Sequence, residues 1–267
     1  NTATTSQLKL RNDFRMRLFT FFAGAELEIF INVPPFIFCS ISVQYSQTIV
    51  VADFMGITTH SGITIGQNNG YAILDCESCG FIHVHPKPTI EQMQDIYPKE
   101  YYSSHYPGWI EKTLSEQEYW RIAFSRRFEV FEKQLPENRR RVLDVGCFLG
   151  LFLQAGKSRG WSVVGIEPSE QGVAHGRKNG LDVRHGFFED FSEHELGKFD
   201  VINLSLTLEH VLDPISLIDK AHGLLSAGGL LCIEVPNDFS ALQQGVKKVL
   251  DKDDYWLSAP HHLKYFN

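Results

Sequence analysis

Residues 143–150 read LDVGCFLG, an apolar run that ends in a turn carrying Gly146 and Gly150. A strand that leads directly into a glycine-containing turn lets a ligand approach the backbone, because glycine has no side chain to block it. The G-x-G-x-x-G pattern of nucleotide-dependent dehydrogenases would need glycine at 146, 148 and 151, but Phe148 and Leu151 stand at two of these positions. The segment therefore predicts a ligand-binding strand, turn and helix, and it disfavours the alternative of a nucleotide-dependent oxidoreductase.

Strands and helices are expected to alternate around this segment. Apolar runs predict strands over 142–145, 162–166, 181–184, 199–205 and 230–235, and amphipathic stretches predict helices over 115–135, 151–159, 170–179, 215–225 and 241–250. We therefore expect an α/β fold, a Rossmann-like, mostly parallel sheet with helices on both faces. A small β-rich or irregular N-terminal module should precede it. Sheets of this kind bind ligands at the carboxyl ends of their strands.

Acidic residues stand near the ends of the first two expected strands. Asp144 lies two residues before Gly146, and Glu167 ends the next strand in the segment GIEPS at 165–169. One strand–helix–strand step separates the two acids, which is the spacing at which a carboxylate binds the ribose of an adenosine. An ionised carboxylate suits that role because it only accepts hydrogen bonds and can take both ribose hydroxyls. The alternative for Glu167 is an acid in a solvated loop.

Six short motifs follow in order: LDVGCxxG at 143–150, GIEPS at 165–169, FDVI at 199–202, EHVxDP at 209–214, GGL at 228–230 and VPN at 235–237. In this order and spacing they resemble the class I S-adenosylmethionine-dependent methyltransferases, in the group that includes ubiquinone-biosynthesis O-methyltransferases and sugar C-methyltransferases. That family usually has glycine at the position of Phe148. The family fold also has two more strands after the position of Asn267, so the resemblance implies that the chain is truncated at its C-terminus. The outer strand of the sheet would then have an unpaired edge unless another segment packs over it.

The resemblance implies that the cofactor is S-adenosyl-L-methionine, and it implies which residues contact each part of that cofactor. The methionine end would be lined by Asp144, Gly146, Cys147 and Gly150, the ribose would be bound by Glu167, and the adenine would be flanked by Phe187 and Glu189. Two of these residues have a plainer alternative. Phe187 could be ordinary core packing, and Cys147 could be a small buried hydrophobic residue.

Methyl transfer to a hydroxyl or a carbon acid also needs a general base. His210 follows the fourth expected strand, where an acceptor should enter, and an unperturbed histidine pKa of about 6.5 suits proton removal near neutrality. Glu209 beside it could orient the imidazole or bind a metal. The alternative is that Glu209 caps the following helix or forms a salt bridge with it, and that His210 only packs. His261 and His262 in PHHLKYF at 260–266 resemble the family's acceptor-side segment P-x-H-x-x-Y-F. Adjacent side chains point in different directions, so at most one of these two histidines should act as a base.

A cysteine pair stands ahead of this domain. Cys76 and Cys79 have the spacing of half a zinc ribbon. Related methyltransferases commonly carry two such pairs, whereas upstream of this pair the chain has only Cys39. His83 and His85 share one face of an expected strand and could replace the lost ligands. The hypothesis is therefore a zinc site at the cysteine pair, and the alternative is a metal-free remnant.

Composition limits the partners. The chain has 267 residues and a net charge of −7, so it has no general attraction for nucleic acid. Five cysteines are too few for a secreted disulfide framework, which favours a reducing compartment and hence the cytoplasm. The apolar run over 29–43 is interrupted by polar residues and prolines and falls short of the roughly 20 residues that span a bilayer, so no membrane span is expected.

Three segments follow from these patterns. Residues 1–70 have no interpretable structure, residues 71–110 form a small CxxC module and linker, and residues 111–267 form the methyltransferase domain with its last strands missing. The expected acceptor is a small metabolite, a nucleotide sugar or a glycan, methylated on oxygen, carbon or nitrogen. A non-catalytic binding protein with a degenerate methyltransferase fold is the second alternative. The sequence does not indicate an oligomeric state.

Overall fold

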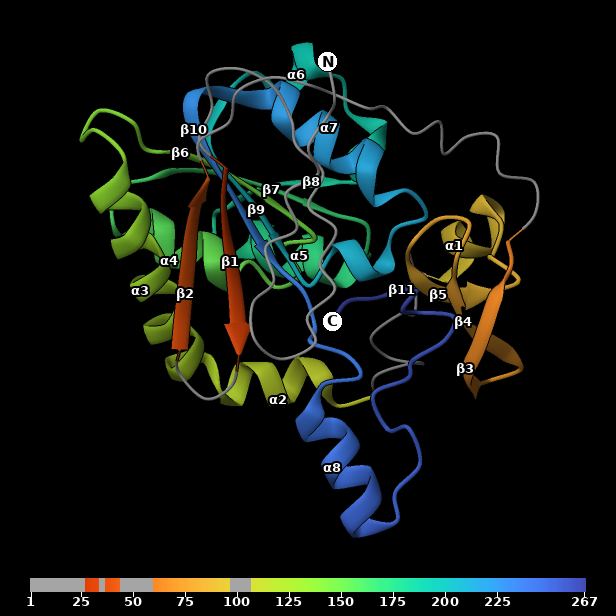
Figure 1. The fold of residues 1–267 in the computed structure, drawn as a ribbon. Helices are drawn as coiled ribbons and strands as arrows, with labels where there is room; N and C mark the ends of the chain where they lie inside the picture. Colours follow the sequence, from red (N-terminus) through yellow and green to blue (C-terminus); the bar gives the residue numbers. More distant parts are fainter. Residues whose placement is uncertain (1–26, 34–36, 44–59, 97–106) are drawn as a thin grey trace, which may run out of the picture.

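A computed structural model of the chain describes residues 27–33, 37–43, 60–96 and 107–267 (Figure 1). For the first two of these ranges only the backbone is described, so the side chain of Cys39 lies outside the described part.

Five parallel strands form the central sheet. They are β6 (Arg141–Val145), β7 (Ser162–Glu167), β8 (Asp182–His185), β9 (Phe199–Ser205) and β10 (Leu225–Glu234), in the spatial order β10-β9-β6-β7-β8. The chain moves outward from β6 to β7 and β8 and then returns to place β9 and β10 on the other side of β6. This puts the reversal of strand order between β6 and β9, where open parallel sheets bind their ligands.

Helices cover both faces of this sheet. One face carries α3 (Gln117–Gln134), α4 (Leu151–Ser158) and α5 (Glu170–Lys178), and the other carries α6 (Glu193–Leu196) and α7 (Pro214–Leu224). Neighbouring strand residues point to opposite faces, so Val142 packs against one helical layer and Leu143 against the other. The predicted Rossmann-like α/β fold with a doubly covered parallel sheet is therefore confirmed.

Local sequence signals set where these helices begin. Ser169 accepts a hydrogen bond from the Gly172 amide at the start of α5 (3.2 Å). Asp213 caps α7 by accepting from two backbone amides, and Pro214 occupies the first turn. The acid that caps α7 is thus Asp213, and Glu209 remains available for another role.

A second sheet has four antiparallel strands. They are β3 (Gly62–Asn68), β4 (Tyr71–Cys76), β5 (Ile82–His85) and β11 (Lys264–Tyr265), in the order β11-β5-β4-β3. The C-terminal strand β11 thus joins a sheet built almost 200 residues earlier, and Tyr265 packs with Ile73 and Val84 in one apolar cluster. The boundary expected at residue 70 falls in the turn between β3 and β4.

The remaining elements lie around these two sheets. They are the hairpin of β1 (Leu27–Val33) and β2 (Ile37–Val43), the helices α1 (Ile90–Ile96), α2 (Trp109–Ser115) and α8 (Ala241–Leu250), and the short 3-10 turns η3 (Phe188–Asp190) and η4 (Leu208–His210). Strand β1 lies beside β10, the outer strand of the central sheet (Figure 1). Within the described ranges, no helix is both long and apolar enough to cross a membrane.

Candidate functional site

The glycine turn after β6 adopts the backbone conformation that its sequence predicts. Gly146 and Gly150 have φ angles of 76° and 75°, which favour glycine over any residue with a side chain. A methyl group on Gly146 would lie 3.3 Å from Oγ1 of Thr207, so the turn also packs closely. Phe148 has a φ of 48° and is therefore a non-glycine residue in the left-handed region. The departure from the family pattern thus lies at a position whose conformation suits glycine.

Glu167 connects this turn to the turn after β7. Its side chain is buried, Oε2 accepts from the Phe148 amide (2.8 Å), and Oε1 accepts from the Ser169 amide (2.9 Å). Burial raises the pKa of Glu167, although both amides oppose the rise by stabilising the carboxylate. Each carboxylate oxygen still has a second lone pair for a further donor. Glu167 is therefore a buried acceptor held between two loops, and not a solvated loop acid.

Asp144 lies at the same edge of the sheet, within a buried polar network. Its Oδ1 accepts from Nδ2 of Asn203 (2.7 Å), and Asn203 in turn accepts from Arg127 (3.2 Å). The Arg127 guanidinium also pairs with Glu234 at 2.7 Å. Burial raises the pKa of Asp144 to about 7, although Asn203 and Arg127 act against the rise. Three of these residues escaped prediction, and the one signal for them was a polar Asn203 inside an apolar strand.

The other predicted cofactor residues have different environments. Cys147 points into the core, where burial raises the pKa of its thiol well above the usual value, so only its backbone can face a ligand. Phe187 is partly buried against the apolar cluster of the small sheet, and its amide donates to Asp190 (2.8 Å). Glu189 is exposed in the turn after β8.

Three polar side chains meet beyond the end of β9. The ring centroids of His210 and His262 lie 5.0 Å apart with the rings nearly perpendicular, and Nε2 of His210 lies 3.9 Å from a carboxyl oxygen of Glu209. His261 contributes its carbonyl, which accepts from Nδ1 of His210 (2.9 Å). Because Nδ1 must carry the proton in that bond, Nε2 is the unprotonated nitrogen of a neutral His210.

Burial controls the charges in this group. It lowers the pKa of His210 to about 4 and that of His262 to about 3, so both rings are neutral at pH 7. It also raises the pKa of Glu209 to about 8, with the nearby acids Asp238 and Glu234 adding to the rise. Glu209 is buried and His210 is partly buried, and both side chains are uncharged at pH 7.

The cysteine pair has two histidine neighbours in the small sheet. Cys76 and Cys79 are buried free thiols, and ligand atoms of His60, Cys76, Cys79 and His83 lie within 4.8 Å of one another. His83 was one of the two proposed replacement ligands. The other, His85, is exposed and lies outside this group. His60 was missed, because nothing in its local sequence marks it.

The part of the chain that forms the central sheet is similar to known methyltransferases. Residues 118–267 match the family model described as a methyltransferase domain. The chain is 39% identical over 108 residues to the ubiquinone biosynthesis O-methyltransferase of Actinobacillus pleuropneumoniae serotype 5b (strain L20), covering 37% of this chain and 46% of that protein. It is 36% identical over 104 residues to the protein of the same name from Pseudomonas aeruginosa (strain LESB58), covering 37% and 45%. The chain therefore spans about half the length of the curated relatives it matches.

A solved structure is also similar. The plantazolicin methyltransferase BpumL in complex with SAH is 18% identical, with a TM-score of 0.43 over 59% of this chain and 65% of that one. Such a TM-score is too low to carry an argument about this chain. The family match itself covers every strand of the central sheet, from β6 to β10.

Proposed function

Because the chain belongs to the methyltransferase-domain family, of the class I S-adenosylmethionine-dependent type, we propose that it transfers a methyl group from S-adenosyl-L-methionine to a hydroxyl group of a small molecule. The observation that carries this proposal is the buried carboxylate of Glu167 between the turns after β6 and β7. An acceptor-only group at that point of a parallel sheet suits the hydroxyls of a ribose.

The cofactor would lie along the carboxyl ends of β6, β7 and β8. The methionine end is assigned to the glycine turn and Asp144, and the ribose to Glu167. Cys147 contributes backbone only, while Phe187 and Glu189 flank the adenine. When bound, S-adenosylmethionine supplies a methyl group that its sulfonium has already made electrophilic. The residues of this chain therefore have to bind, align and exclude water, and no covalent catalysis is needed from them.

We assign proton removal from the acceptor to Nε2 of His210. The His261 carbonyl fixes the tautomer by accepting from Nδ1, and burial keeps the ring neutral at pH 7. The acceptor hydroxyl would give its proton to Nε2 of His210. Bound S-adenosylmethionine would supply the methyl group to the acceptor oxygen, and its sulfur would keep the electrons of the carbon–sulfur bond. The curated relatives are named as O-methyltransferases, which supports oxygen as the methylated atom. His262 lies edge-on to His210 and helps to exclude water from it.

Calorimetry tests the cofactor assignment. Wild type should bind S-adenosylmethionine and S-adenosylhomocysteine and give no signal with NAD. Glu167→Gln should bind both about 10- to 100-fold more weakly, because a hydrogen bond to a charged group contributes about 1.5–3 kcal/mol. Glu170→Gln, an exposed change in the first turn of α5, is the matched control. Equal affinities of the Glu167 variant and wild type would remove the ribose assignment.

A second experiment tests the base. With a labelled methyl donor and a panel of small phenols and sugars, His210→Gln should lower turnover by about 10²- to 10⁴-fold while cofactor affinity stays unchanged. His222→Gln changes an exposed histidine on α7 and should behave as wild type. Undiminished turnover by the His210 variant would show that another group takes the proton.

A further inference from the structure

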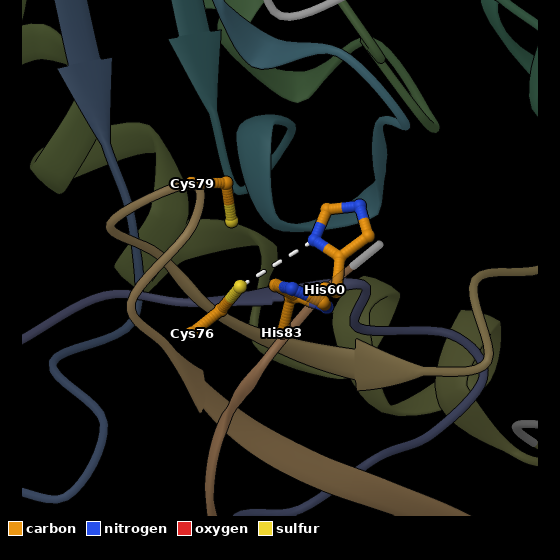
Figure 2. A group of neighbouring side chains, drawn as sticks. All are labelled: His60, Cys76, Cys79 and His83. Atoms are coloured by element: carbon orange, nitrogen blue, oxygen red, sulfur yellow. Dashed lines mark hydrogen bonds between the residues drawn. The ribbon is translucent and has the colours of Figure 1, made fainter. Parts of the chain in front are cut away.

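Four side chains converge at one end of the small sheet, outside the methyl-transfer site (Figure 2). We propose that His60, Cys76, Cys79 and His83 bind one zinc ion as a structural site. Two thiolates and two imidazoles form a complete tetrahedral set for zinc, and a site in which protein supplies all four ligands leaves no open position for catalysis.

The distances fit this ion. All four ligand atoms lie within 4.8 Å of one another, and Nδ1 of His60 lies 3.4 Å from Sγ of Cys76. Usual zinc–sulfur and zinc–nitrogen bond lengths place the ligand atoms of a tetrahedral site about 3.3–3.8 Å apart. Closure around the ion therefore requires side-chain adjustments and no change of fold.

His83 gives an independent indication of a ligand. Its side chain is completely buried, and Nδ1 donates to the Val84 carbonyl (2.7 Å), which leaves the lone pair on Nε2. That Nε2 is buried without a hydrogen-bond partner, which is unfavourable unless something binds it. A histidine whose one nitrogen donates to a carbonyl while the other is free has the usual arrangement of a metal ligand.

The strand pairing explains why these residues meet. Gly62 of β3 pairs with Cys76 at the end of β4, so His60 falls beside the cysteine. His83 of β5 pairs with Leu74 of β4, which brings it to the same end of the sheet. The turn between β4 and β5 is closed by the Gly80 amide donating to the Cys76 carbonyl (2.9 Å), and Gly80 has a φ of 73° that suits glycine. The turn thus returns Cys79 toward Cys76.

Charge also favours a divalent ion. Two thiolates balance the charge of Zn²⁺, so the occupied site is neutral overall and suits its buried position. A mixed sulfur and nitrogen tetrahedron is typical of zinc, whereas magnesium and calcium prefer oxygen ligands.

Metal analysis of the full chain tests the proposal. Protein produced with zinc in the medium and dialysed against a weak chelator should retain one zinc per chain, and replacement by Co²⁺ should give the absorption of a tetrahedral site with a thiolate charge-transfer band. His60→Ala should lose most of the zinc under the same dialysis. His60→Cys should retain it, because a thiolate restores the fourth ligand.

His85→Ala is the matched control, since His85 is an exposed histidine two residues from His83 on the same strand. It should keep its zinc. The proposal is overturned if wild type contains no zinc, or if its cysteines are joined in a Cys76–Cys79 disulfide, which mass spectrometry of alkylated protein detects. Equal retention by His60→Ala and wild type would overturn the assignment of His60. Zinc content is measured without cofactor, so the result is independent of the proposed methyl transfer.

Discussion

Replacing Glu209 by glutamine should make the folded protein more stable than wild type at neutral and alkaline pH. The Glu209 side chain is only 1% exposed, and among the described residues its Oε2 has no hydrogen-bond partner. Burial raises its pKa from 4.5 to about 8. Between these two values the folded protein holds a proton that the unfolded chain releases, so the equilibrium depends on pH.

The sign and size follow from this difference. Because the pKa of Glu209 is higher in the folded protein than in the unfolded chain, its contribution to the free energy of unfolding is fully present below pH 4.5. That contribution is lost as the pH rises toward 8. Each pKa unit corresponds to about 1.4 kcal/mol, so at pH 7 wild type has lost about 3 kcal/mol through this group. Glutamine has the same shape and does not titrate, so the variant avoids the loss.

Urea unfolding at pH 5, 7 and 8 measures the effect. Wild type and Glu209→Gln should have similar unfolding free energies at pH 5 and differ by about 3 kcal/mol at pH 7, with the variant more stable. Glu137→Gln changes an exposed glutamate and should follow wild type at every pH. If wild type and the Glu209 variant keep parallel pH profiles, the carboxyl group is not buried in its protonated form and the reasoning fails.

Two further changes test the scaffold of the site. Gly150→Ala should cost about 1–2 kcal/mol for its positive φ and about 1–3 kcal/mol more for crowding, because its methyl group would lie 2.5 Å from a buried leucine carbon. Gly160→Ala has the same kind of φ and open space around it, so thermal unfolding should show the first cost only. Arg127→Met should cost about 3 kcal/mol in urea unfolding, because Glu234 loses its cation in a mostly buried place. Arg121→Met removes an exposed ion pair and should leave stability unchanged, and equal losses for both arginine variants would contradict a structural role for the Arg127 network.

The central sheet could be predicted from sequence because its strands are short, apolar and separated by amphipathic helices. All five expected strands and the helices between them are present in the fold. Strand β10 begins at Leu225, five residues earlier than expected, and its pairing with β9 is irregular between Leu225 and Leu230. The segment over 226–229 reads SAGG and consists of small residues, so no apolar run marks this start.

The small sheet and its histidines were harder to predict, because they depend on contacts between distant residues. Strand β11 has two residues and pairs with β5, far away in the chain, so it carries no periodicity of its own. His60 joins the cysteines through the register of β3 on β4, and no local motif around His60 indicates that pairing. The motif C-x-x-C can be recognised in the sequence because its two cysteines are close together along the chain.

The buried carboxyl groups connect the parts of the candidate site. Every acid buried within the described ranges lies in or just beyond the carboxyl end of a central strand: Asp144 on β6, Glu167 on β7, Glu209 after β9 and Asp238 after β10. Burial raises the pKa of all four, because it removes the carboxyl groups from water and so disfavours their charged form. A core built only for stability would carry apolar residues at these positions. The sulfonium and ammonium groups of S-adenosylmethionine would bring positive charge to the same edge, so the arrangement that weakens the free protein is the one that favours a cationic methyl donor.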